Sequence, residues 1–260
     1  MPENHHHVEH LAEDEESYFV SMTDMMVGML FVFIIMLMSF ALNYREAERK
    51  KVETVTEITG ADQARVQMLE KLQGLLEEAG VRVTIDRENG VLRLPEDILF
   101  PSASDKIKQE GQTALSVLAR GLGDVLPCYA YVKENVKTVA GGESCTTNHR
   151  LEAVFIEGHT DNIPISSGTR FSDNWGLSTA RAITTYKILT TTSPALTALV
   201  NKRAEPVLSV SGYGDNRPVA DNTTAEGRSR NRRIDLRFLM ATPRPKELDA
   251  IENKVNKDAP

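Results

Sequence analysis

One uninterrupted apolar stretch constrains this chain more than any other feature. From Met25 to Tyr44 the sequence has 20 residues without a charged side chain. At 1.5 Å per helical residue, this stretch is about 30 Å long, which matches the hydrocarbon thickness of a bilayer. The residues before it are acidic and lack the cleavage pattern of a signal peptide. We therefore expect residues 20–44 to form one uncleaved transmembrane helix. The alternative is a buried core helix, although core helices rarely stay apolar over this length.

The charges of the chain are distributed unevenly. The 260 residues include 30 Lys and Arg against 37 Asp and Glu, which gives a net charge of −7 and argues against general nucleic-acid binding. Residues 1–19 contain six acidic residues and no Lys or Arg, and we interpret them as an acidic tail. A mean hydropathy of −0.30 excludes a protein with many membrane spans.

Asp24 lies at the N-terminal edge of the apolar stretch. A carboxylate near hydrocarbon is costly, so an ionisable group there is a functional hypothesis by default. Gly28, Phe31 and Ile35 follow on the same helical face, and Gly28 permits another helix to approach closely. We therefore interpret Asp24 as an ion-carrying group. The alternative is a boundary residue, because a helix N-terminus in the headgroup region also favours negative charge.

The charges on either side of the apolar stretch argue against a C-terminal part outside the cytoplasm. Arg45, Arg49, Lys50 and Lys51 follow the apolar stretch, and no basic residue precedes it closely. The positive-inside rule alone would therefore place the C-terminal part in the cytoplasm.

The rest of the chain divides into a linker, a domain and a tail. Residues 45–80 are charged and helix-prone, with a weak heptad pattern that Gly60 interrupts, so a short coiled coil and a solvated spacer are both open. Residues 81–240 predict an α/β domain. Its strands are expected at 81–86, 91–97, 151–158, 207–214 and 232–240, and its helices at 107–122 and 177–189. Residues 241–260, with three prolines and many charges, predict a flexible tail.

Cys128 and Cys145 are the two cysteines of the chain, and both follow the apolar stretch. Their short separation favours a disulfide, which would persist outside the cytoplasm. The alternatives are two free thiols, or a zinc site with His149 that would lack a fourth ligand.

Three motifs occur in order between residues 158 and 236: GHTDNIP at 158–164, NWGLSTARA at 174–182 and GYGDNRPVADNTTAEGRSRNRRIDL at 212–236. Together they resemble the peptidoglycan-binding domain of the OmpA C-terminal family, over roughly residues 81–240. With residues 17–45 included, the chain resembles the B subunits of ion-driven stators, as in flagellar motors. The amino-acid sequence of its apolar helix resembles most that of the B subunit of the Zorya anti-phage defence system.

This resemblance implies the fold class: a single N-terminal transmembrane helix, a helical linker, and an α/β OmpA-like domain with a mixed sheet packed by helices. It also implies a peptidoglycan-binding site at Asp161, Asn174, Leu177 and Arg181. The diaminopimelate of a stem peptide presents an ammonium and a carboxylate, which suit one acid and one planar base. Asp161 would bind the ammonium and Arg181 the carboxylate.

The other two residues share the helical face of Arg181. Asn174 would donate a hydrogen bond, and Leu177 would pack against the aliphatic part of the ligand. The alternatives are a turn residue at Asp161, a helix cap at Asn174 and an exposed helical arginine at position 181. The loop before Asn174 is longer than the family pattern, which leaves contacts from Asp173 open.

The resemblance further implies a stator subunit with no cofactor and no metal. Two copies of this chain would lie inside a ring of five polytopic A-type subunits in the bacterial inner membrane. Asp24 would carry a proton, with sodium as the alternative, and the stretch after Tyr44 would act as a plug. Because peptidoglycan lies outside this membrane, the N-terminus would be cytoplasmic and the domain periplasmic. A flagellar stator subunit and a passive membrane-to-wall tether are the alternatives.

Two other classes of protein are disfavoured. No G-x-S-x-G elbow, HExxH motif or P-loop is present, which argues against an enzyme. Residues 226–237 carry a local charge of +3, but no aromatic residues are interleaved as in many nucleic-acid-binding surfaces. We therefore expect no nucleic-acid partner.

Overall fold

The computed structural model describes residues 6–132, 147, 149–165 and 170–242, with side chains from residue 22 onward. The chain divides into two units, Met1–Thr56 and Glu57–Pro260. Cys145 and nearly all of the predicted tail at 241–260 lie outside the described residues.

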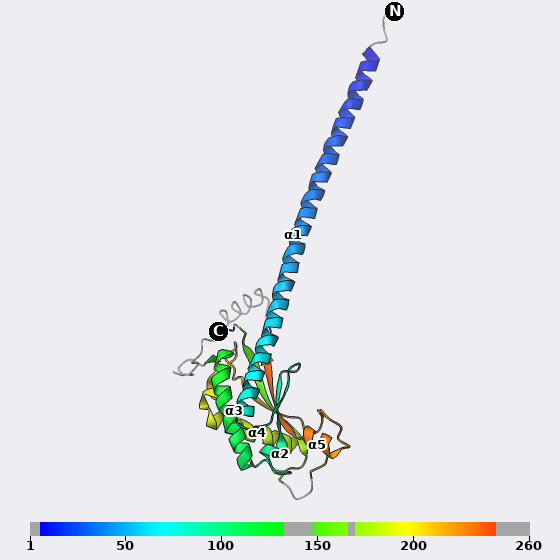
Figure 1. Cartoon of the computed structure of the whole chain (residues 1–260). Helices are drawn as coiled ribbons and strands as arrows, with labels where there is room; N and C mark the ends of the chain where they lie inside the picture. The colour runs from blue at the N-terminus through cyan, green and yellow to red at the C-terminus, as the bar shows by residue number, and fades with distance from the viewer. Residues whose placement is uncertain (1–5, 133–146, 148, 166–169, 243–260) are drawn as a thin grey trace, which may run out of the picture. The chain divides into compact units, whose positions relative to one another are not determined.

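Helix α1 (His6–Glu78) contains the whole apolar stretch (Figure 1). The large apolar side chains of that stretch are exposed, for example Met25 at 75% and Phe40 at 70%. Within the described part of the chain, α1 is the helix that is long and apolar enough to cross a membrane, and none of its most apolar window is buried. The burial expected of a core helix is therefore not found for this stretch among the described residues.

The last turns of α1 differ from the linker predicted at 45–80. Four of their side chains are at most 1% exposed and belong to the core of the second unit: Met68, Leu69, Leu72 and Leu76. Val52 and Val55, earlier in the heptad pattern, are exposed. The domain therefore begins inside α1 rather than at residue 81. The sequence pattern misplaced this boundary because apolar residues three and four apart suit a core helix as well as a coiled coil.

The second unit is built on a five-stranded mixed sheet, as the sequence predicted. Its strands are β1 (Thr84–Asp86), β2 (Val91–Pro95), β4 (Leu151–His159), β6 (Leu208–Gly212) and β7 (Arg233–Met240), in the order β1-β2-β7-β4-β6. Strands β4 and β6 are parallel, and the other pairs are antiparallel. The β1–β2 hairpin turns through Gly90, whose φ of 68° lies in the left-handed region that glycine tolerates.

Two long helices pack beside this sheet, α3 (Gln109–Val125) and α4 (Asn174–Thr192) (Figure 1). The sequence predicted both. It did not predict the shorter elements: helices α2 (Glu96–Leu99) and α5 (Ala225–Asn231), 3-10 turns η1 (Leu126–Cys128) and η2 (Pro194–Ala198), and the two-stranded sheet of β3 (Tyr131–Val132) and β5 (Leu199–Val200). Such elements are too short to produce a periodic apolar pattern.

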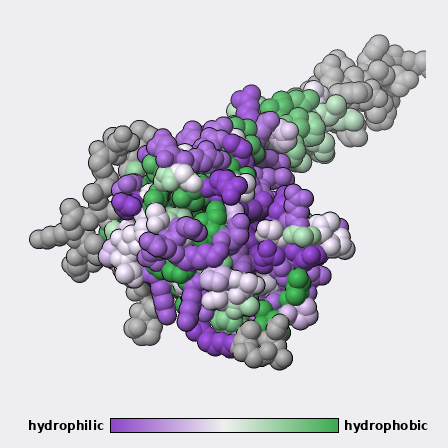
Figure 2. Space-filling model, turned by 60° about the horizontal axis from the view of Figure 1, so that its bottom comes forward, coloured by the Kyte–Doolittle hydropathy of each residue, from purple (hydrophilic) through white to green (hydrophobic). Residues whose placement is uncertain are grey.

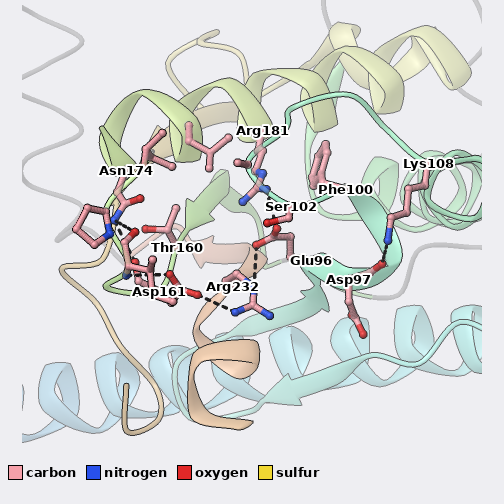
Figure 3. Close-up of a pocket in the computed structure, with 15 residues that line it drawn as sticks. Glu96, Asp97, Phe100, Ser102, Lys108, Thr160, Asp161, Asn174, Arg181 and Arg232 are labelled. Carbon is pink, nitrogen blue, oxygen red and sulfur yellow. Dashed lines mark hydrogen bonds and ion pairs between the residues drawn. The ribbon is translucent and has the colours of Figure 1, made fainter. Parts of the chain in front are cut away.

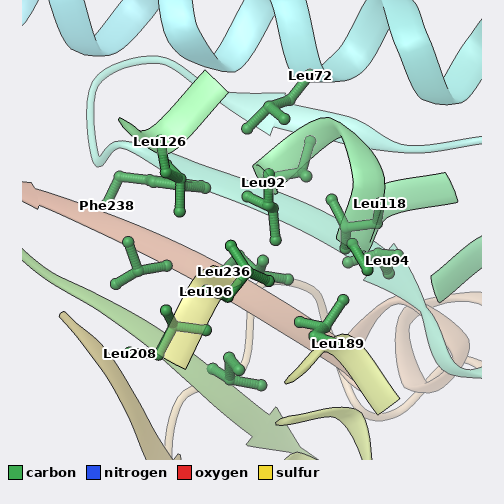
Figure 4. Close-up of a cluster of buried hydrophobic side chains, with 14 of the residues drawn as sticks. Leu72, Leu92, Leu94, Leu118, Leu126, Leu189, Leu196, Leu208, Leu236 and Phe238 are labelled. Carbon is green, nitrogen blue, oxygen red and sulfur yellow. The ribbon is translucent and has the colours of Figure 1, made fainter. Parts of the chain in front are cut away.

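The core lies between one face of the sheet and the helices. Figure 4 shows Leu72 of α1, Leu118 of α3 and Leu189 of α4 directed toward strand residues such as Leu92 and Leu236. Helix α4 approaches β4 closely at Gly158, where a Cβ would overlap the carbonyl group of Ser178. This contact fixes the start of α4 beside the end of β4. The outer surface of the second unit is mainly hydrophilic on the face in Figure 2.

The assignment of the end of α1 to the domain can be tested by truncating one buried leucine. Leu72→Ala should lower the free energy of unfolding by about 2–5 kcal/mol, because it leaves a cavity in the core. Val55→Ala, at an exposed position, should change it by less than about 0.5 kcal/mol. Urea unfolding of the full chain in detergent, followed by fluorescence of the single tryptophan, measures both. Equal small effects would restore the interpretation of residues 61–76 as a spacer.

Candidate ligand-binding site

A pocket of about 460 Å³ lies where the end of β4, the start of α4, α2 and Arg232 meet (Figure 3). All four side chains predicted as ligand-binding residues line it: Asp161, Asn174, Leu177 and Arg181. The structure therefore brings together residues that are up to 20 positions apart in the sequence. It also adds four charged residues from outside the predicted set: Glu96, Asp97, Lys108 and Arg232.

Asp161 combines a turn role with a charged contact in the pocket. One carboxylate oxygen, Oδ1, accepts a hydrogen bond from the backbone N–H of Ile163 at 3.0 Å. The other, Oδ2, accepts one from Nη1 of Arg232 at 2.7 Å. The turn alternative and the charged role are thus compatible, because each uses a different oxygen.

Asn174 is the first residue of α4 and does not cap it. The cap is Asp173, whose carboxylate accepts a hydrogen bond from the backbone N–H of Gly176 at 2.7 Å. The amide of Asn174 instead donates to the backbone carbonyls of Asp161 at 3.2 Å and Ile163 at 3.1 Å. Asn174 therefore holds the loop after β4 against the start of α4.

Arg181 is not the exposed helical arginine that the sequence left open, since it is only 2% exposed. Its Nη2 lies 2.6 Å from Oε1 of Glu96, and its Nε donates to the carbonyl oxygen of Ser104 at 2.9 Å. Its guanidinium also lies over the ring of Phe100, 5.4 Å from the centroid. The predicted carboxylate-binding arginine therefore already has an internal partner.

Arg232 is the more accessible arginine of the pocket, with a side chain that is 35% exposed. It lies between two acids, with Nη1 at 2.7 Å from Asp161 and Nε at 3.6 Å from Glu96 (Figure 3). Burial raises the pKa of Glu96, and the charges of Arg181 and Arg232 act in the opposite direction. Sequence analysis placed Arg232 only in a basic run, although the third motif contains it.

The pocket is lined by three acids and three bases, and two of the acids, Glu96 and Asp161, pair with its two arginines. A ligand with an ammonium and a carboxylate on one carbon can replace such internal pairs with charge-assisted hydrogen bonds of the same kind. A ligand with a single charge would leave one buried charge without a partner, which is costly. This arrangement favours zwitterions.

A second polar cluster lies on the sheet face that α3 and α4 do not cover. Glu157, His159 and Asp235 offer ligand atoms within 4.8 Å of one another. However, Arg237 donates to both carboxylate oxygens of Glu157 at 2.9 Å, and Arg233 donates to Asp235 at 3.0 Å. A metal ion would have to displace these arginines, so we interpret the cluster as a buried network that stabilises the sheet.

Titration of this network should make the domain sensitive to acid. Burial alone would raise the pKa of Glu157, but His159 and Arg237 beside it hold that pKa at about 2. The pKa of an unfolded Glu is near 4.5, so this group stabilises the fold above that pH and loses its contribution as the pH falls toward 2. Burial also lowers the pKa of His159. Because an unfolded His has a pKa near 6.5, protonation of His159 also lowers the stability of the fold as the pH falls below about 6.5.

We predict that the free energy of unfolding falls by about 3 kcal/mol through Glu157 between pH 4.5 and 2. In Glu157→Gln this part of the pH dependence should disappear, although the variant is less stable at neutral pH. Urea unfolding of both proteins at several pH values measures it. Parallel pH curves for the two proteins would contradict the role of Glu157.

Cys128, the last residue of η1, is in a disulfide. The thiolate needed for the alternative zinc site with His149 is therefore not available. Because Cys145 lies outside the described residues, its predicted pairing with Cys128 stays a prediction.

The segment that contains the site is similar to known proteins. Residues 131–232 match the model of the OmpA family. Motility protein B of Bacillus subtilis (strain 168) is 44% identical over 86 residues, which is 33% of this chain and 30% of that protein. Motility protein B of Helicobacter pylori (strain J99) is 28% identical over 163 residues, 62% of this chain and 50% of that protein. The chain thus spans at most half the length of these two relatives.

A crystal structure of a putative MotB-like protein from Desulfovibrio vulgaris is also similar, at 22% identity and a TM-score of 0.49, covering 72% of this chain and 99% of that one. The segment that matches the OmpA family thus follows an N-terminal helix of membrane-spanning length. In sequence, the chain is similar to motility protein B.

Proposed function

We propose that this chain is a peptidoglycan-anchored stator subunit of a proton-driven motor complex in the bacterial inner membrane. The observation that carries the proposal is the pocket in which Glu96 and Asp161 pair with two arginines, in a chain whose helix α1 also has a membrane-length apolar stretch that begins beside Asp24. The similarity to motility protein B supports the same combination of wall anchor and membrane helix.

In this proposal the pocket binds the diaminopimelate of a peptidoglycan stem peptide. The ammonium replaces Arg232 as the partner of Asp161, and the carboxylate takes over part of the pairing between Arg181 and Glu96. Leu177 supplies an apolar contact for the aliphatic chain of the ligand. Asn174 keeps the loop after β4 in place. The two side chains released by the ligand, Arg232 and Glu96, lie 3.6 Å apart and can pair with each other.

The membrane part would act with other subunits, because one helix cannot enclose an ion path. Two copies of this chain would lie inside a ring of five polytopic A-type subunits. Asp24 would take up a proton from the periplasmic side and release it toward the cytoplasm. The domain would be periplasmic and the N-terminus cytoplasmic, in spite of the basic residues after Tyr44, because large domains are exported largely regardless of flanking charge. The disulfide at Cys128 supports an oxidising compartment.

Two uses of such a motor have support from different observations. The amino-acid sequence of the apolar helix favours an anti-phage defence system of the Zorya type. The similarity to motility protein B favours a flagellar motor. A passive membrane-to-wall tether needs the pocket but not Asp24. We favour the defence role and keep the flagellar role as the second candidate.

Replacing the membrane carboxylate tests the motor. Asp24→Asn should abolish phage protection by cells that carry the native gene cluster, because the amide cannot exchange a proton at neutral pH. Asp124→Asn, which removes a carboxylate at an exposed position of α3, should protect like the wild type. Plating efficiency measures protection, with membrane levels matched by blotting. Equal protection by all three proteins would favour the passive tether. No protection by the wild type would favour the flagellar role, with swimming speed as the readout.

Replacing the pocket carboxylate tests the wall anchor. Asp161→Asn should weaken binding to purified peptidoglycan sacculi at least about tenfold, because it removes the negative charge but keeps the acceptor for Ile163. Asp124→Asn, at an exposed position of α3, is the matched control. Co-sedimentation of the full chain in detergent measures binding. Unchanged binding by a folded Asp161→Asn would reject this pocket as the wall-binding site.

A further inference from the structure

The basic run at 228–237 does not form a single surface patch, because the structure gives most of its arginines separate partners. Arg228 donates to the carbonyl oxygens of Asn222 and Thr223 at 2.9 and 3.0 Å. The others pair with acids: Arg232 with Asp161, Arg233 with Asp235 and Arg237 with Glu157. Only Arg230 is left without a hydrogen bond or ion pair to the described residues. Its charge is therefore free for a ligand.

Arg230 lines a second pocket, of about 410 Å³, between the β1–β2 edge of the sheet and the junction of α5 with β7. We call it the arginine pocket. Five arginines and one acid line it: Arg82, Arg93, Arg230, Arg232, Arg233 and Asp97. Arg82 is exposed and, like Arg230, makes no ion pair or hydrogen bond within the described part of the chain. Because Arg93, Arg232 and Arg233 are paired with acids, the charges that favour an anion here are those of Arg82 and Arg230, although the whole chain has a net charge of −7.

The rest of the lining is mainly apolar. Val83, Pro95, Ile98 and Val219 form its apolar part beside the polar Thr84 and Ser229, and Val83 is only 7% exposed. A bare inorganic anion would leave these surfaces in contact with water. The lining therefore suits a carboxylate attached to a small apolar group, with the guanidinium groups of Arg82 and Arg230 as its donors.

The arginine pocket adjoins the first pocket, because Asp97 and Arg232 line both. One ligand can therefore reach the two pockets at once. In a peptidoglycan stem peptide, diaminopimelate is followed by D-alanine, whose methyl group and free terminal carboxylate match the apolar lining and the two unpaired arginines. The chemical order of groups in the peptide corresponds to the order of the two pockets.

We propose that the arginine pocket binds the terminal carboxylate of a stem peptide, next to the diaminopimelate in the first pocket. Arg82 and Arg230 bind the carboxylate, and the apolar lining contacts the methyl group of D-alanine. The inference rests on the proposed wall-binding function for the identity of the ligand, and on the pocket itself for its chemistry.

The test uses the full chain in detergent and two small probes, N-acetyl-D-alanyl-D-alanine and its C-terminal amide. Isothermal titration calorimetry should show binding of the acid and at least tenfold weaker binding of the amide. The double variant Arg82→Gln/Arg230→Gln should bind the acid at least about tenfold more weakly than the wild type. Arg120→Gln/Lys187→Gln removes the same charge at exposed positions of α3 and α4, and should bind like the wild type.

Three results would overturn the proposal: no binding of the acid by the wild type, equal binding of acid and amide, or unchanged binding by the double variant. Asp161→Asn separates this failure from failure of the proposed function. It should bind the acid probe at least as tightly as the wild type and lose its affinity for sacculi. If the wild type binds the acid probe but not sacculi, the proposed wall anchor fails and the assignment to a stem peptide falls with it. Because both arginines are exposed, the melting temperature of the double variant should match the wild type.

Discussion

The ion pair between Glu96 and Arg181 holds the candidate site together. It joins α2, which directly follows β2, to the middle of α4, and both side chains are almost completely buried. A buried pair is costly to desolvate, so its net stabilisation is small, but removal of either partner leaves an isolated charge in the interior. The hydrogen bond from Arg181 to the carbonyl oxygen of Ser104 extends this constraint to the segment after α2. The shape of the pocket therefore depends on a contact between side chains that are far apart in the sequence.

The two faces of the sheet differ in chemistry: one is apolar and the other is charged. Residues such as Leu236 and Ile156 alternate with Asp235 and Glu157, so that one face of β7 and β4 packs against helices and the other carries ion pairs. On the charged face, Glu157 and Asp235 each have an arginine within hydrogen-bond distance. The candidate site forms at the end of β4, where this charged layer and the helix layer meet.

Sequence reasoning recovered what local patterns encode. Strands β2, β4 and β7 and helices α3 and α4 have apolar periodicity, and the four residues that the family resemblance implied, Asp161, Asn174, Leu177 and Arg181, line one pocket. Two features were missed for a common reason. Glu96 lies 85 positions before Arg181, and the leucines at the end of α1 pack on strands that follow them, so both contacts depend on tertiary structure. Periodicity identifies the apolar face of a helix but not the surface that covers it. The alternatives at Asn174 were likewise settled by a neighbour, since Asp173 occupies the capping position.

Arg232 belongs to both pockets, and this sharing has a thermodynamic consequence. A carboxylate that attracts Arg232 toward the second pocket weakens its pairing with Asp161, which then has greater affinity for an ammonium group. Linkage requires the reverse effect to be equal in size, so a cation on Asp161 also frees Arg232 for an anion. Occupancy of the two pockets would therefore be positively cooperative. A molecule that carries both groups at the correct separation would be retained more strongly than the affinities of its separated halves suggest.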